Sequence, residues 1–178
     1  MFNHKAISVS IPKQYDYLEI SNWLEKKGTE IYGSHFKILS SDHHIVFSLI
    51  AYFVKDIQVC KKNGIDLTKG IMLAGPIGCG KTSIMTLMKY LAVSESKFLF
   101  KSCRNISFEF IQDGYEVIHK YSTGKPNITT SKIICFDDLG TENNLKYFGN
   151  ECNVMAEILL SRYDLFTSKK RSSNKGIF

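Results

Sequence analysis

One stretch of the sequence combines glycines with a lysine and a threonine at a spacing that suits phosphate binding. It reads Gly75, Pro76, Ile77, Gly78, Cys79, Gly80, Lys81 and Thr82, and Ser83 follows. Glycines can adopt positive φ and let backbone N–H groups turn toward an anion. Lys81 would place a positive charge beside the β- and γ-phosphates of a nucleotide, and the Thr82 hydroxyl would ligate Mg2+. Residues 75–83 are therefore predicted to bind a nucleoside triphosphate, with Lys81 in a catalytic role.

The segments on either side favour the same interpretation. The pattern G-x-x-x-x-G-K-[ST], called Walker A, is expected to follow a buried strand and to open a helix. Residues 70–74 are a short apolar run bounded by glycines and are predicted to form that strand. Apolar residues then recur at helical spacing, namely Ile84, Leu87, Met88 and Leu91. The alternative is a glycine-rich turn that carries Lys-Thr by coincidence.

Two acidic residues would complete the site. Asp137 and Asp138 follow an apolar run over 132–136, which is typical of a strand buried on both faces of a parallel sheet. Ligands of such sheets bind beyond the carboxyl ends of the strands. Asp137 would hold Mg2+ through water and orient Thr82 (the Walker B role), and Asp138 would polarise the attacking water. Two exposed acids in a turn are the alternative.

Length and composition are those of an ordinary globular domain. The chain has 178 residues, of which 44% are hydrophobic and 22% charged, and a net charge of +6. That charge is compatible with nucleic-acid contact, and a solvated basic surface explains it equally well. The five scattered cysteines are expected to be reduced thiols of a cytoplasmic protein. No signal peptide is recognised, and the most apolar segment, residues 45–54, is too short to span a bilayer.

The N-terminal residues 1–40 are predicted to form a small α+β accessory segment. Alternation over 6–11 indicates a strand, and apolar residues from Tyr15 to Gly28 indicate a short helix with Trp23 in the core. Residues 31–39 are expected to form another strand.

Residues 41–166 are predicted to form an α/β core, and residues 167–178 a basic, disordered tail. The expected core elements, besides those named above, are a helix from Asp42 to Gly64, a strand over 98–101, a helix over 106–118 interrupted near Gly114, a loop over 120–131 and a helix capped by Asn150 and running to Leu165.

These motifs together resemble a known family. The residues that carry the likeness are 75–82, the segment Ile133-Ile134-Cys135-Phe136-Asp137-Asp138-Leu139-Gly140-Thr141-Glu142, and the segment from Tyr147 through Met155-Ala156-Glu157-Ile158-Leu159 to Arg162-Tyr163. They are similar to the AAA+ ATPases of the helicase-loader and transposition-helper branch, DnaC-like and IstB-like, over roughly residues 65–166. The resemblance implies a three-layer P-loop core with a parallel sheet, ATP with Mg2+, assembly of several copies, and loading or remodelling of a replicative helicase or a transposase on DNA.

The sequence departs from that family after the helix that ends in Arg162-Tyr163. The family continues into a strand with a polar sensor residue and then to an arginine finger, whereas residues 168–175 are polar and basic. We therefore expect a C-terminally truncated member with weak hydrolysis, because an arginine finger contributes about 10^3–10^5 in rate.

Two other functions remain open at this point. One is a non-catalytic protein-interaction fragment of such an ATPase, in which nucleotide plays no part. The other is a small-molecule phosphotransferase, which is disfavoured because residues 83–161 lack an arginine cluster for a lid over the phosphates. Neither the partner, the preferred DNA nor the adenine-binding residues follow from the sequence.

Overall fold

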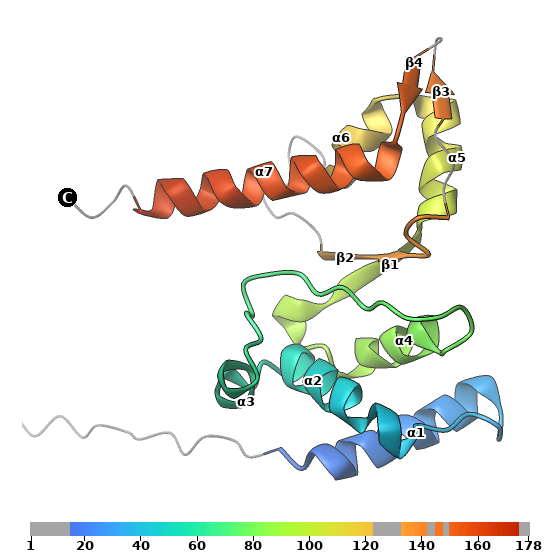
Figure 1. Cartoon of the computed structure of the whole chain (residues 1–178), viewed down its shortest axis with the longest axis vertical. Coiled ribbons are helices and arrows are strands. Elements are labelled where there is room, and N and C mark those ends of the chain that lie inside the picture. The colour runs from blue at the N-terminus through green and yellow to red at the C-terminus, as the bar shows by residue number, and fades with distance from the viewer. Residues whose placement is uncertain (1–14, 123–132, 142–144, 148–149, 175–178) are drawn as a thin grey trace, which may run out of the picture. The chain divides into compact units, whose positions relative to one another are not determined.

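The computed structural model divides the chain into two compact units (Figure 1). Unit 1 covers Met1–Val93 and unit 2 covers Ser94–Phe178. The structure describes residues 15–122, 133–141, 145–147 and 150–174. Helices make up most of the described part of both units, and a small parallel sheet lies in unit 2, so the protein is of the mixed α/β class.

The described part of unit 1 consists of helices joined by loops, and no strand is described in it. Its elements are α1 (Tyr17–Tyr32), the 3-10 turn η1 (Ser40–Asp42), α2 (His43–Val54), α3 (Ile57–Lys62) and α4 (Lys81–Leu91). Asp16 begins α1 by accepting hydrogen bonds from the backbone N–H groups of Leu18 and Glu19, at 3.0 and 2.9 Å. The helices α1, α2 and α4 pack together around a buried apolar core formed by Leu24, Val46, Leu49, Ile50, Phe53, Leu87 and Met88.

Three expectations for this part of unit 1 are wrong. The single helix predicted from Asp42 to Gly64 is two helices, because Lys55 adopts a left-handed conformation (φ 56°) and Asp56 then caps α3. The strand predicted over 31–39 is absent, since α1 continues to Tyr32 and the Ile38 N–H donates to the Glu25 carboxylate, at 2.7 Å. Trp23, expected in the core, is 45% exposed. The strand predicted over 6–11 lies outside the described residues.

The strand predicted over 70–74 is also absent. These residues belong to the long loop that joins α3 to α4 (Figure 1). Met72 is 82% exposed, and no strand is described in unit 1 to pair with this segment. An apolar run forms a strand only where a neighbour accepts its backbone hydrogen bonds, and such a neighbour is not described within unit 1.

Unit 2 contains the sheet. Its elements are the 3-10 turn η2 (Ser94–Ser96), β1 (Phe98–Ser102), α5 (Cys103–Asp113), α6 (Glu116–Ser122), β2 (Ile133–Asp137), β3 (Leu145–Tyr147), β4 (Asn150–Cys152) and α7 (Val154–Asn174). Strands β1 and β2 are parallel, with Phe98 opposite Ile133 and Ser102 opposite Asp137. β3 and β4 form a separate antiparallel pair. The described sheet therefore has two parallel strands, and the three-layer P-loop core is not seen.

One apolar cluster holds unit 2 together. Its members come from α5, α6, β4 and the start of α7, and Ile134 and Phe136 of β2 pack against it. The cluster consists of Cys103, Ile106, Phe110, Val117, Tyr121, Cys152, Val154, Met155 and Ile158. The predicted strands over 98–101 and 132–136 and the helix interruption at Gly114 are confirmed.

Three details of unit 2 differ from expectation. Asn150 begins β4 rather than capping a helix, and Asn153 caps α7 by accepting from the Ala156 N–H at 2.9 Å. The helix continues to Asn174 instead of ending near 166, because lysine and arginine are good helix formers even without an apolar pattern. β2 is only partly buried, and its first residue, Ile133, is 47% exposed.

Among the residues that the structure describes, none of the helices combines the length and the apolar character needed to cross a membrane.

Candidate functional site

The predicted phosphate loop is built by its own backbone and by the start of α4. Gly78 and Gly80 have φ of 81° and 84°, which an alanine adopts only under strain. Gly80 occupies the N-cap position, and α4 begins at Lys81. The Ile84 N–H donates to the Gly80 carbonyl oxygen at 2.9 Å, which closes the first helical turn. The glycine pattern therefore produces the turn into a helix that the sequence predicted.

Lys81 bends back over the loop. Its ammonium donates to the carbonyl oxygens of Gly75 and Pro76, at 2.9 and 2.7 Å, and lies 3.7 Å from the Cys79 Sγ. A Cβ at Gly75 would lie 3.1 Å from that sulfur. Two loop carbonyl oxygens thus hold the ammonium group of Lys81, and phosphate oxygens could replace them as its hydrogen-bond acceptors.

The helix that follows offers a favourable end to an anion. No acidic residue lies in the first turn of α4, and no side chain caps the helix at Gly80. The partial positive charge of the helix N-terminus is therefore not offset within that turn. Thr82 and Ser83 lie in the same turn, and the Thr82 carbonyl accepts a hydrogen bond from Thr86 Oγ1 at 2.8 Å. The other loop residues, Pro76, Ile77 and Cys79, are exposed, so the loop is accessible.

The predicted acidic pair lies at the carboxyl end of β2. Asp137 is the last residue of the strand and stands opposite Ser102 in the ladder. Asp138 has a positive φ of 57° and begins a turn in which its carbonyl oxygen accepts from the Thr141 N–H and Oγ1, at 3.2 and 2.8 Å. A non-glycine residue with positive φ is uncommon and is frequent at functional sites. The strand therefore changes direction at the residue predicted to act on water.

The structure brings together residues 75–83 in unit 1, and Asp137 with Asp138 in unit 2. The loop is accessible and precedes a helix, but the strand expected before it is absent, whereas the acid pair follows a strand as expected. Within the described parts of the chain, no group of three or more His, Cys, Asp or Glu side chains could hold a metal ion.

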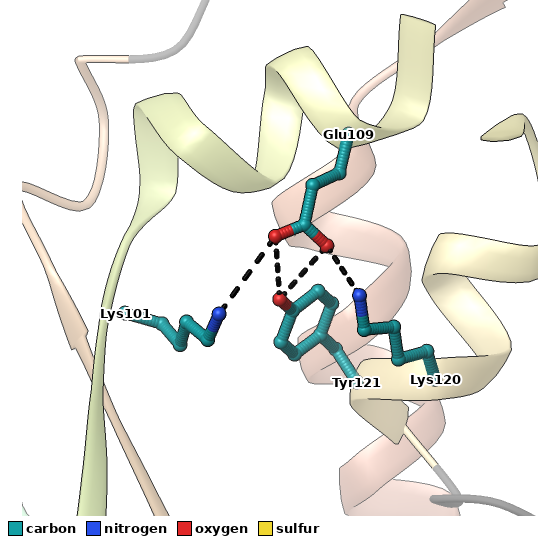
Figure 2. A network of polar contacts seen from close by, with 4 residues as sticks. All are labelled: Lys101, Glu109, Lys120 and Tyr121. Carbon is teal, nitrogen blue, oxygen red and sulfur yellow. Dashed lines mark hydrogen bonds and ion pairs between the residues drawn. The ribbon is translucent and has the colours of Figure 1, made fainter. Parts of the chain in front are cut away.

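Unit 2 also contains a polar network that the sequence did not reveal. Figure 2 shows the Glu109 carboxylate between Lys101, Lys120 and Tyr121. It accepts from Lys120 Nζ at 2.7 Å and from the Tyr121 hydroxyl at 2.9 Å, and Lys101 Nζ lies 3.8 Å away. Burial and this hydrogen bond raise the pKa of Tyr121 to about 12. The three partners of Glu109 lie 8 to 12 positions from it in the chain, and no local sequence pattern marks them.

Arg162, part of the family-like segment, also has a structural role. Its guanidinium donates to the Tyr121 carbonyl oxygen at 2.8 Å and lies 5.9 Å from the centre of the Phe136 ring. Phe136 directly precedes Asp137, so Arg162 connects α7 and α6 to the end of the strand that carries the acid pair.

Comparisons with protein-family models, with curated proteins and with solved structures find no match. The likeness to the AAA+ branch therefore rests on the residues quoted above.

Proposed function

We propose that this protein binds ATP with Mg2+ through residues 75–83 and acts as an AAA+-type ATPase. The conformation of the loop carries the proposal. Lys81 is held by the loop carbonyls at the start of α4, and Gly78 and Gly80 supply the positive φ that turns the backbone. An accessible cradle that ends in a helix N-terminus binds phosphate by its backbone N–H groups.

Each residue of the site has a distinct role. Lys81 exchanges its carbonyl partners for the β- and γ-phosphate oxygens, while the N–H groups of 75–83 hold the remaining charge. As expected from the sequence, Thr82 and Asp137 would hold Mg2+, which would supply positive charge to the phosphates. Asp138 accepts a hydrogen bond from the water that attacks the γ-phosphate and so orients it.

The biological role that fits this chemistry is the one implied by the family resemblance. Nucleotide binding and hydrolysis would remodel or load a replicative helicase or a transposase on DNA in the cytoplasm, with several copies assembled. The five cysteines are free thiols, which agrees with a reducing compartment.

Calorimetric titration with Mg-ATP tests the proposal. The wild-type chain should bind saturably, and Lys81→Ala should weaken binding at least about tenfold, since it removes the one full charge of the loop. Lys62→Ala, which removes an exposed lysine from the end of α3, is the matched control and should bind as the wild type does. Equal affinity in all three proteins, or no binding by any, would refute the assignment.

A non-catalytic interaction fragment is the second candidate. It is favoured by the described parallel sheet, whose two strands are fewer than a complete nucleotide-binding core would contain. In that case, partner binding would not respond to nucleotide. Capture of a helicase or transposase partner by the wild type and by Lys81→Ala, with and without Mg-ATP, separates the two functions.

A further inference from the structure

The only tryptophan of the chain forms an exposed aromatic pair in unit 1. Trp23 of α1 and Tyr90 of α4 have ring centroids 6.4 Å apart and ring planes at 76°, an edge-to-face arrangement. Trp23 is 45% exposed and Tyr90 is 53% exposed. Large aromatic side chains gain much free energy from burial. Burial therefore does not explain why such residues stand at these exposed positions.

One lysine lies over a ring of this pair, and a second lysine precedes it in the sequence of α1. Lys27 Nζ lies 5.4 Å from the centre of the Tyr90 ring, and Lys26 is exposed beside it on α1. Glu30 accepts from Lys27 at 2.8 Å, and both side chains remain substantially exposed, 32% for Lys27 and 52% for Glu30. An exposed ion pair of this kind adds little stability and is readily exchanged for another anion. The surface thus combines two exposed rings with two cations, one of them held by an exchangeable acid.

We propose that Trp23, Tyr90, Lys26 and Lys27 form a binding surface for single-stranded nucleic acid. An unpaired base stacks on the Trp23 ring, and the flanking backbone phosphates contact the two lysines. Aromatic platforms beside basic side chains bind single strands with little sequence preference, because every base has a stackable face. A duplex keeps its bases inside the helix and cannot use the platform. A protein partner fits less well, because lysine is depleted at protein interfaces.

This inference does not rest on the proposed ATPase function. Tyr90 lies nine residues after Lys81 on α4, which places it about 14 Å along the helix from the phosphate loop. Loss of the loop's function should leave the surface intact, and the two proposals can fail separately.

The ion pair of Lys27 with Glu30 allows a test based on whether nucleic-acid affinity rises or falls. In the free protein the Glu30 carboxylate is paired with Lys27, and a nucleic-acid phosphate must displace this carboxylate. Removing the acid should therefore strengthen binding, whereas removing the lysine should weaken it. A surface that binds through its apolar rings alone would respond to neither change.

The probe is a 20-nucleotide single-stranded oligothymidine. Stacking should quench the fluorescence of Trp23, which is the only indole in the chain. Anisotropy of a labelled strand gives affinities for variants that lack the indole. Trp23→Ala should weaken binding about tenfold, and Trp23→Phe should restore most of the affinity. Lys27→Gln should weaken binding and Glu30→Gln should strengthen it, each about threefold.

Salt dependence measures the phosphate contact directly. For single strands, the slope of log affinity against log salt changes by about 0.7 for each neutralised phosphate. Lys27→Gln should reduce the slope by about that amount. Tyr163→Ala, which removes an exposed tyrosine of α7, and Glu116→Gln, which removes an exposed acid of α6, are the matched controls. Both controls should bind as the wild type does.

Several results would overturn the proposal. These are unchanged affinity in Trp23→Ala, absence of quenching by a strand that binds, equal binding of a duplex of the same length, and the same direction of change in Lys27→Gln and Glu30→Gln. Failure of the strand to bind the wild type, in a sample with intact far-ultraviolet dichroism, would also exclude it and would direct the search for an occupant to proteins.

Discussion

The two halves of the predicted nucleotide site are held in place by different forces. Residues 75–83 are exposed, and local interactions fix their conformation, namely two positive-φ glycines and the bonds of Lys81 to carbonyls five and six positions away. Asp137 ends a strand that needs β1 as a partner and the apolar cluster of unit 2 as support. The loop should therefore tolerate changes in packing but not in backbone conformation, whereas the position of Asp137 should also depend on the packing of the apolar cluster.

The largest expected effect comes from the apolar cluster. Phe110 is fully buried in α5, and Phe110→Ala should lower the free energy of unfolding by about 3–5 kcal/mol, through lost burial and the cavity that remains. Circular dichroism follows all helices, whereas Trp23 fluorescence reports on unit 1. We expect the dichroism transition to move to lower denaturant while the fluorescence transition moves less. Equal shifts of both transitions would show that the two units unfold as one cooperative core.

A pair of glycines tests the backbone of the loop. Gly80 and Gly64 have similar positive φ, 84° and 69°, and a Cβ at either position meets open space. Alanine at either position should cost about 1–2 kcal/mol in backbone strain. Only Gly80→Ala should also lower ATP affinity, by about tenfold, because its N–H belongs to the cradle. Titration calorimetry compares the two variants, and equal losses of affinity would mean that the loop conformation is irrelevant to nucleotide.

The smallest expected effect concerns the polar network behind the strand. Burial opposes ionisation of Glu109, but the hydrogen bonds from Lys120 and Tyr121 and the charges of Lys120 and Lys101 outweigh it, so its pKa lies below the ordinary 4.5. A lowered pKa in the folded state stabilises the fold above pH 4.5, and this contribution declines as the pH falls through the lowered value. Glu109→Gln should therefore be about 1 kcal/mol less stable at pH 7.

The difference between wild type and Glu109→Gln should shrink as the pH falls below 4.5, as measured by urea unfolding at several pH values. Glu116→Gln, on the exposed side of α6, is the control with the same change of charge. A difference that stays constant down to pH 3 would contradict the assigned pKa direction.

Features set by neighbouring residues could be predicted from the sequence. The start of α4 after Gly80, the interruption at Gly114 and the strand before Asp137 are all found. Each depends on a glycine conformation or on an apolar run that has a partner. The helix break at Lys55 does not follow from the apolar stripe, which continues across it. The capping residue Asp56 is the sequence signal that marks the break.

Features that depend on distant residues could not be predicted. The run over 70–74 has the composition of a strand, but the sequence does not say whether a neighbour will pair with it. The exposure of Trp23 and the network around Glu109 depend on how helices pack, which the period of a single helix does not encode.

The most direct test is whether the two halves serve one ligand. ATP affinity should be measured by calorimetry with and without Mg2+, for the wild type, Asp137→Asn and the control Asp113→Asn, an exposed acid at the end of α5. We predict that Mg2+ strengthens ATP binding in the wild type and in the control but not in Asp137→Asn, while all three bind metal-free ATP equally. An unchanged Mg2+ effect in Asp137→Asn would show that the acid pair and the phosphate loop do not act on the same nucleotide.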